Sequence, residues 1–231
     1  MKTEVLYRPS YSLAIVHLAG NETIQVEAAA MVSMSQGMTL ETTMAGGLLS
    51  ALKRSILGGE SFFMNTYQAP ADGGRIMLAP PLPGDVVVRE LQNETLVVQS
   101  GSYLASARGI QVDTKWGGAR TFFASEGLIM LKCAGTGTLI LSSYGAIHEE
   151  MLAPRQVLTV DTGHLVAFTE DIGFKVRTIG GIKSTLFSGE GLVVDLTGPG
   201  RVLMQTRSMD AFLAWLMPQV QRHIQPTRHG G

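Results

Sequence analysis

The sequence predicts an all-β protein built from three tandem β units and a short C-terminal helix, and three observations support this. Apolar runs of strand length alternate with turn residues, which include 27 glycines among 231 residues. Four sequence anchors recur three times in the same order. Helical periodicity is clearest near the C-terminus. We therefore expect barrel-like or sandwich-like units within one compact domain, residues 1–231.

The first two anchors are a kinked apolar strand and, further along, a pair of glycines. The kinked strand occupies residues 98–105 and 160–167 and, more loosely, 26–33. The glycine pairs are Gly46-Gly47, Gly117-Gly118 and Gly180-Gly181. Glycine reaches positive φ without steric cost, so these positions are expected to be bends.

The other two anchors frame a pair of strands. A carboxylate precedes the first strand, in LGGESFFM, FASEGLIM and FSGEGLVV, which contain Glu60, Glu126 and Glu190. A glycine then begins the next strand, at Gly74, Gly137 and Gly200. Stretches such as 127–143 and 191–206 therefore predict hairpins with a short glycine turn.

These anchors divide the chain into units and flanking segments. Residues 48–56, LLSALKRSI, lengthen the first unit and are compatible with two helical turns. The C-terminal helix begins at a capping serine, ends at Pro218 and is apolar on both faces, so we expect the barrel or a neighbouring subunit to cover it. The predicted segments are repeat 1, 10–90; repeat 2, 91–152; repeat 3, 153–207; the helix, 208–218; and a tail, 219–231.

Composition excludes several classes of partner. A net charge of −1 and a pI near 6.5 offer no basic footprint for nucleic acid. No apolar run is long enough to span a bilayer, and the first residues lack the continuous apolar stretch of a signal peptide. The lone Cys133 is expected to be a buried core residue, and the lack of a second cysteine fits a reducing compartment. We expect a cytoplasmic location and leave peripheral membrane association open.

Motifs for catalysis and cofactor binding fail on their spacing. Residues 180–184 lack the earlier glycine of a phosphate loop, and residues 198–200 lack the third glycine of a dinucleotide site. The five histidines show no paired spacing, and His148 with Glu149 and Glu150 is interpreted as a solvated loop. We expect no enzyme activity, no catalytic residues, no cofactor and no metal.

The repeated glutamates are the remaining candidates for a ligand site. Glu60, Glu126 and Glu190 are expected to accept backbone hydrogen bonds in the turn before each strand. The alternative is that three equivalent carboxylates share a surface that binds a cation or a basic partner. We favour the structural role.

The chain resembles the altered-inheritance-of-mitochondria protein 24 family of mitochondrial biogenesis proteins over most of residues 10–218. FSGEGLVVDLTGPGRVLMQTR (187–207) and FASEGLIMLKCAGTGTLIL (123–141) carry the likeness. The first copy departs from it, with Ser61 in place of glycine. The resemblance implies units similar to those of the tryptophan RNA-binding attenuation protein, a pseudo-threefold axis, frequent oligomerisation, no established catalytic residue and a bacterial or archaeal cytoplasm.

Three functions follow as hypotheses. The leading one is a non-catalytic scaffold or interaction protein that forms a ring-like homo-oligomer, a trimer or a multiple of it, because the chain is 45% hydrophobic and only 16% charged. The second is a small-ligand-binding protein or an unrecognised enzyme with a site between repeats. RNA binding is a third, disfavoured by the charge balance.

Overall fold

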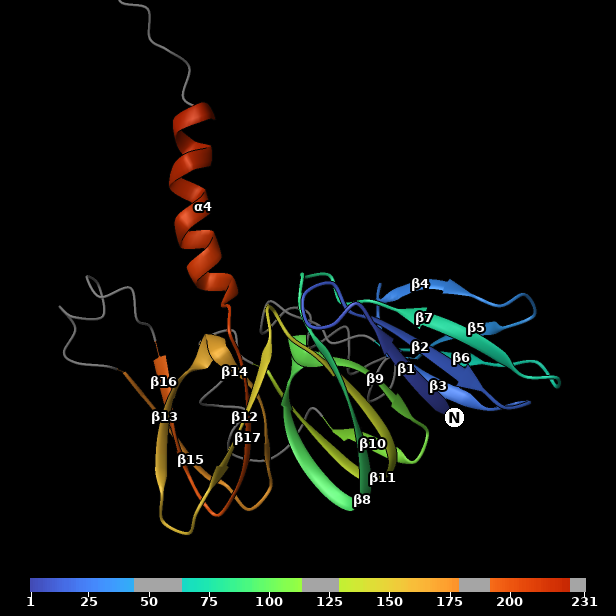
Figure 1. Ribbon diagram of the computed structural model, residues 1–231, viewed down its shortest axis with the longest axis horizontal. Helices are drawn as coiled ribbons and strands as arrows, with labels where there is room; N and C mark the ends of the chain where they lie inside the picture. The colour runs from blue at the N-terminus through green and yellow to red at the C-terminus, as the bar shows by residue number, and fades with distance from the viewer. Residues whose placement is uncertain (44–63, 114–128, 179–191, 225–231) are drawn as a thin grey trace, which may run out of the picture.

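The protein consists mainly of antiparallel β-strands (Figure 1). The computed structural model describes residues 1–43, 64–113, 129–178 and 192–224. Within these ranges the sheets are open, so the barrel form of the predicted units is wrong, whereas the two-layered sandwich is present. The insertion at 48–56 lies outside the described residues.

The described part of the first unit contains six strands, which we designate positions a to f in chain order. They are β2 (Leu13–Leu18), β3 (Thr23–Glu27), β4 (Met31–Met34), β5 (Thr39–Thr43), β6 (Met64–Gln68) and β7 (Gly74–Leu78). Position f pairs with a and c, and position e pairs with b and d. The unit is thus two three-stranded layers, and β1 (Lys2–Leu6) extends the first layer by pairing with β2.

The third unit repeats these pairings with its own six strands. They are β12 (Ile147–Leu152), β13 (Val157–Asp161), β14 (Leu165–Thr169), β15 (Gly173–Thr178), β16 (Leu192–Thr197) and β17 (Gly200–Gln205). β17 pairs with β12 and β14, and β16 pairs with β13 and β15. β16 and β17 therefore lie in different layers, and the hairpin predicted over 191–206 is wrong.

The second unit has the same plan with fused strands. β8 (Val86–Gln99) supplies positions a and b, and β11 (Met130–Ser142) supplies e and f. β9 (Tyr103–Ala107) and β10 (Ile110–Asp113) are positions c and d and pair with opposite halves of β11. The hairpin predicted over 127–143 is wrong, because its glycines form a bulge at Gly135/Thr136 within one strand.

Two of the predicted anchors coincide with recurring backbone features. The kink of the first anchor is a 3-10 turn at Ser100–Ser102 and again at Thr162–His164. The fourth anchor requires glycine in two units, since φ is +140° at Gly137 and +148° at Gly200. The strand pairings thus recur three times along the chain. A pseudo-threefold axis and likeness to the attenuation protein stay predictions.

Position c has the same irregularity in every unit. Where position c pairs with position f, the register shifts by one residue, and the skipped residue is Val32, Leu104 or Val166. A bulge of this kind inserts an unpaired residue and bends the strand. The recurrence aligns the three units residue by residue.

Neighbouring units are joined by pairing position b of one with position c of the next. β3 pairs with β9, and β8 pairs with β14. The register is the same at both junctions, with the pairs Ile24↔Ala107, Gln25↔Ser106 and Val26↔Ala105 at the first and Leu96↔Thr169, Val97↔Phe168 and Val98↔Ala167 at the second. Figure 1 shows the result as a row, with the first unit at one end and the third at the other.

Side chains also cross from each unit into the core of the unit before it. Leu104 and Ala105 of the second unit are buried in the core of the first. Val166 and Ala167 of the third unit are buried in the core of the second. Each junction therefore combines strand pairing with apolar packing, which stabilises it far more than surface contact would.

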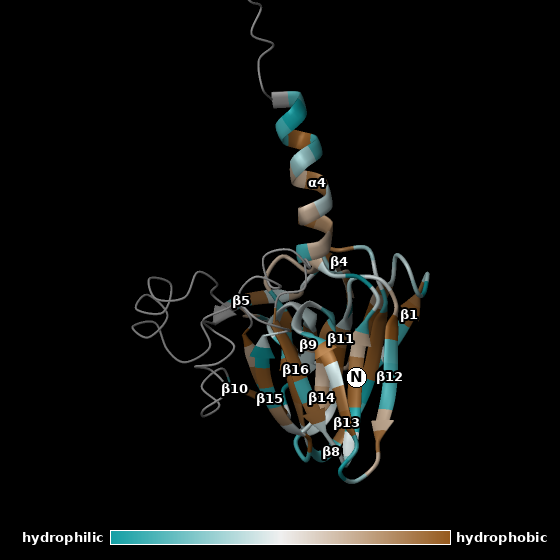
Figure 2. Ribbon diagram, turned by 90° about the vertical axis from the view of Figure 1, so that its left-hand side faces the viewer, coloured by the Kyte–Doolittle hydropathy of each residue, from teal (hydrophilic) through white to brown (hydrophobic). Residues whose placement is uncertain are grey.

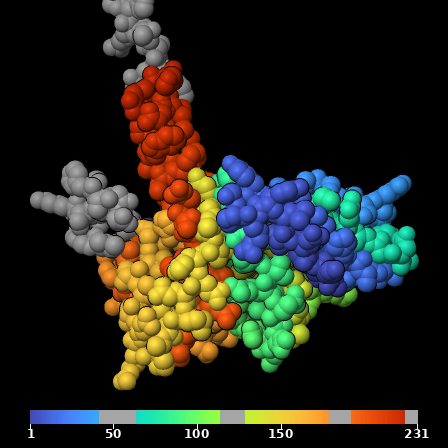
Figure 3. All heavy atoms as spheres, viewed as in Figure 1, coloured from blue at the N-terminus to red at the C-terminus, as the bar shows by residue number. Residues whose placement is uncertain are grey.

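The C-terminal helix, α4 (Met209–Ile224), differs from the prediction in length and surroundings. The Ser208 hydroxyl accepts a hydrogen bond from the Ala211 N–H (3.4 Å), which confirms the capping role. The helix continues through Pro218 to Ile224, so the predicted end and the predicted tail at 219–224 are wrong. Figures 1, 2 and 3 show that α4 stands clear of the sheets, and Trp215 is 62% exposed, so the sheets in the described ranges do not cover it.

A buried carboxylate fastens the N-terminal segment to the junction of the first two units. Asp85 is 3% exposed and accepts two hydrogen bonds from the Arg8 guanidinium, at 2.7 and 2.8 Å. It also accepts hydrogen bonds from the Ser12 hydroxyl (3.3 Å) and the Val86 N–H (2.8 Å). Removing this group would leave several donors without an acceptor.

We expect Asp85→Ala to lower the free energy of unfolding by about 2 kcal/mol, because it removes a buried carboxylate that accepts hydrogen bonds from a half-exposed guanidinium, a hydroxyl and a backbone N–H. Urea titration monitored by circular dichroism measures this. Asp195→Ala is the matched control, since Asp195 also pairs with an arginine, Arg177 at 2.7 Å, but on the surface. Equal losses in the two variants would contradict a special role for Asp85.

Candidate functional site

The repeated glutamates fall outside the part of the chain that the structure describes. This applies to Glu60, Glu126 and Glu190 and to the three glycine pairs of the second anchor. Their turn role and their proposed shared surface therefore both stay predictions. The described residues carry four features that could form a site.

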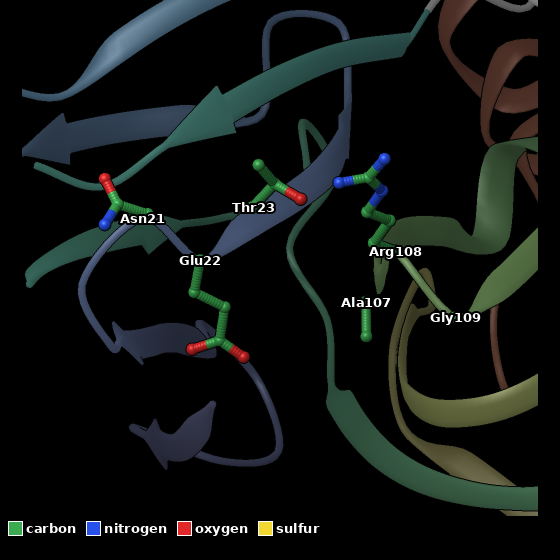
Figure 4. A pocket seen from close by; sticks show the side chains of 6 residues that line it. All are labelled: Asn21, Glu22, Thr23, Ala107, Arg108 and Gly109. Atoms are coloured by element: carbon green, nitrogen blue, oxygen red, sulfur yellow. The ribbon is translucent and has the colours of Figure 1, made fainter. Parts of the chain in front are cut away.

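The first feature is a pocket at the junction of the first and second units. It has a volume of about 300 Å³. Its lining comes from the turn before β3 and the turn between β9 and β10, namely Asn21, Glu22, Thr23, Ala107, Arg108 and Gly109 (Figure 4). A site between repeats was expected only for the ligand-binding hypothesis.

The two charged side chains of this pocket do not pair with each other. In Figure 4 the Glu22 carboxylate and the Arg108 guanidinium point in different directions. Burial alone would raise the pKa of Glu22, but hydrogen bonds from the N-terminal ammonium group and the Ala19 N–H lower it. Glu22 is thus engaged within its own unit, and Arg108 is the exposed charge that a ligand in this pocket would meet.

The second feature is a hollow at the base of α4, with a volume of about 430 Å³. Tyr144 and Phe212 meet edge to face across it, with ring centroids 6.2 Å apart. His164 lines it as well, and its Nδ1 lies 2.8 Å from the Gln205 carbonyl oxygen. Polar side chains share this lining with the aromatic rings, and among them the Ser208 hydroxyl is the group that caps α4.

The third feature is the outer edge of the first unit. β4 pairs with β7 on one side, and no strand of the described chain pairs with its other side. Three apolar side chains of β4 are exposed, Met31 at 37%, Val32 at 58% and Met34 at 41%. Position c of the other units, β9 and β14, is buried throughout these positions. The sequence alone does not reveal this edge, because β4 is exposed only through the lack of a second pairing strand in the described chain.

The fourth feature is a group of titratable side chains near the first junction, of which two are buried and Glu27 is partly buried. Burial raises the pKa of Cys133 to about 12, which makes the thiol an inert core residue and confirms its predicted burial. Burial also raises the pKa of Tyr103, whose hydroxyl lies 2.8 Å from Ser106 Oγ. Burial raises the pKa of Glu27, at the end of β3, to about 7.

The cluster of His148, Glu149 and Glu150 was predicted to be a solvated loop; the loop is wrong, although His148 and Glu149 are exposed. All three residues belong to strand β12. Glu149 pairs with Arg201 at 3.0 Å and with Arg89, so its carboxylate bridges the second and third units. These groups are partly exposed, which limits what the pairs add to stability.

The described residues offer neither a metal-binding cluster nor a membrane-spanning helix. No group of three or more His, Cys, Asp or Glu side chains gathers there in a way that could hold a metal ion. In the same ranges, no helix combines the length and apolar character needed to cross a bilayer.

The fold and these surfaces define the class: an all-β protein of recurring two-layered units in open sheets, joined through their strand edges. The chain belongs to the mitochondrial biogenesis AIM24 family, whose model matches residues 3–207. The resemblance inferred from the sequence is therefore confirmed.

Two relatives from Streptococcus pyogenes agree with this assignment. The chain is 27% identical over 215 residues to the uncharacterized protein M6_Spy0233 of serotype M6, which covers 89% of this chain and 86% of that protein. The crystal structure of protein SPYM3_0169 is similar with a TM-score of 0.78 and 24% identity, over 94% of this chain and 99% of the other. At this identity the structural likeness shows a shared fold alone.

We expect Glu27→Gln to raise the free energy of unfolding relative to wild type, and to raise it by more at pH 8 than at pH 5. The pKa of Glu27 in the folded protein, about 7, exceeds its usual value of 4.5. The stability that the protonated Glu27 carboxyl contributes is therefore complete below about pH 4.5 and is lost as the pH rises through 7. The difference should reach at most about 3 kcal/mol. Urea titrations from pH 5 to 8 test this, and an equal difference at both ends would contradict it.

Proposed function

We propose that this protein is a non-catalytic scaffold or interaction protein that works as a homo-oligomer of ring-like form. The observation that carries the proposal is the exposed apolar edge at β4, since Met31, Val32 and Met34 occupy positions that are buried in the other two units. Soluble chains rarely leave such an edge open, because it invites pairing with another strand.

The chemistry of the described residues supports the non-catalytic part. The one cysteine is an inert core thiol. At the base of α4 the Ser208 hydroxyl serves as the helix cap, and His164 Nδ1 lies 2.8 Å from the Gln205 carbonyl oxygen. The proposal therefore includes no enzyme activity and no cofactor. The buried, unpaired Cys133 supports a reducing compartment, and we place the protein in the cytoplasm.

We expect the purified protein to elute as a single oligomer of defined mass at micromolar concentration. Size-exclusion chromatography with light scattering measures the mass, and native mass spectrometry counts the copies. Dilution to nanomolar concentration should release monomers if the contact is non-covalent. A monodisperse monomer at micromolar concentration would overturn the proposal.

Binding of a small anionic ligand is a second candidate, favoured by the pocket between the first two units. Arg108 is its exposed cation. Native mass spectrometry of protein taken from its own cell should then find a retained small molecule, and Arg108→Ala should lose it. Absence of any bound mass in the wild-type protein would remove this candidate.

A further inference from the structure

We propose that the partner of the exposed β4 edge is strand β13 of a second copy, so that copies join head to tail by the pairing that joins the units within one chain. This inference rests on the proposed function and names its contact. It follows from three observations about positions b and c.

The first observation is that one rule generates both junctions inside the chain. Position b of a unit pairs antiparallel with position c of the next, in the same register each time. The rule leaves two strands unused: β4, at position c of the first unit, and β13, at position b of the third. In the described chain β13 pairs only with β16, and β4 only with β7.

The second observation is where these two strands lie. Figure 1 shows β13 at one end of the row of units and β4 at the other. One chain therefore cannot pair its own β4 with its own β13. A second copy can supply the missing strand, and a contact between two different surfaces repeats from copy to copy until a ring closes.

The third observation is the burial that the missing contact would restore. Val32 is the bulged residue of β4 and is 58% exposed, whereas its equivalents Leu104 and Val166 are fully buried in the core of the preceding unit. Met77, on β7, is likewise only partly buried where Ile140 and Leu203 are fully buried. The edge of the first unit thus has the side chains of a junction without its partner.

The register of the new junction follows from the two that exist. Val98 and Val160 are equivalent residues of the kinked anchor, and Ala167 and Ser33 are equivalent residues after it. The contact should therefore pair Ser33 with Val160, Met34 with Thr159 and Ser35 with Leu158 of the second copy. Val32 would then enter the core of the third unit of that copy, among residues such as Val194 and Leu196.

Cysteine cross-linking tests this register. Met34→Cys/Thr159→Cys places thiols at two positions that are exposed in the single chain and directly opposite in the proposed contact. Opposed residues in antiparallel strands have Cα atoms about 4.5–5.5 Å apart, within reach of a disulfide. Mild oxidation should convert most of this variant to linked multimers on a non-reducing gel. The buried native Cys133 should not take part.

The matched control displaces one thiol along the same face of β13. In Met34→Cys/Val157→Cys the second cysteine is two residues out of register and equally exposed. Its Cα would lie about 7–8 Å from its counterpart, beyond disulfide reach. We expect several-fold less cross-linking, and equal cross-linking in both variants would overturn the register.

A charge at the bulge tests the packing. Val32→Lys should convert the oligomer to a folded monomer, because the side chain is exposed in the single chain but would enter an apolar core in the contact. Met151→Lys is the control, since Met151 is 62% exposed on β12, outside the proposed contact, and should leave the oligomer intact.

The outcomes separate this inference from the proposed function. Selective cross-linking together with loss of the oligomer in Val32→Lys supports both. An oligomer that resists Val32→Lys and does not cross-link between residues 34 and 159 overturns the head-to-tail contact and leaves the scaffold proposal standing. A wild-type monomer overturns both.

Discussion

The antiparallel pairing between position b of one unit and position c of the next is the contact on which the rest of the structure depends. It joins a strand of one unit to a strand of the next. The bulge of position c against position f places Leu104 and Val166 in the preceding core. Because a shift of one residue would reverse every side chain between core and solvent, burial on both sides fixes the register. The unit, the row and the exposed end all follow from this geometry.

The sequence predicted the β-rich fold and several local backbone features, because glycine and apolar periodicity report the backbone conformations that individual positions require. The kink at Gly101 and Gly163 and the positive φ of Gly137 and Gly200 are such demands. The two predicted hairpins were wrong, because a glycine between two apolar runs suits a hairpin turn, a bulge and a step between layers equally well. Pro218 misled for a related reason: proline removes one hydrogen bond, and α4 continues despite that loss.

The candidate surfaces were less predictable than the fold. The apolar residues of β4 resemble those of β9 and β14 in sequence. They are exposed because, in the described chain, β4 lacks the second pairing strand that β9 and β14 have. The raised pKa of Glu27 likewise depends on burial at a junction between segments distant in sequence. The recurrence of a glutamate at positions 60, 126 and 190 does not distinguish its two roles. A residue that each unit needs for its turn recurs as readily as one that binds a ligand.

The fused strands of the second unit have a mechanical consequence. β8 and β11 each run without interruption through both layers, pairing with each other along almost their whole length. In arrays whose repeats touch only at their faces, one repeat can melt while its neighbours persist. In the middle unit, unfolding one layer would disrupt β8 and β11, which also form the other layer. β8 and β9 of this unit also pair with strands of the two flanking units. The three units should therefore move as one rigid body and unfold together in one cooperative step.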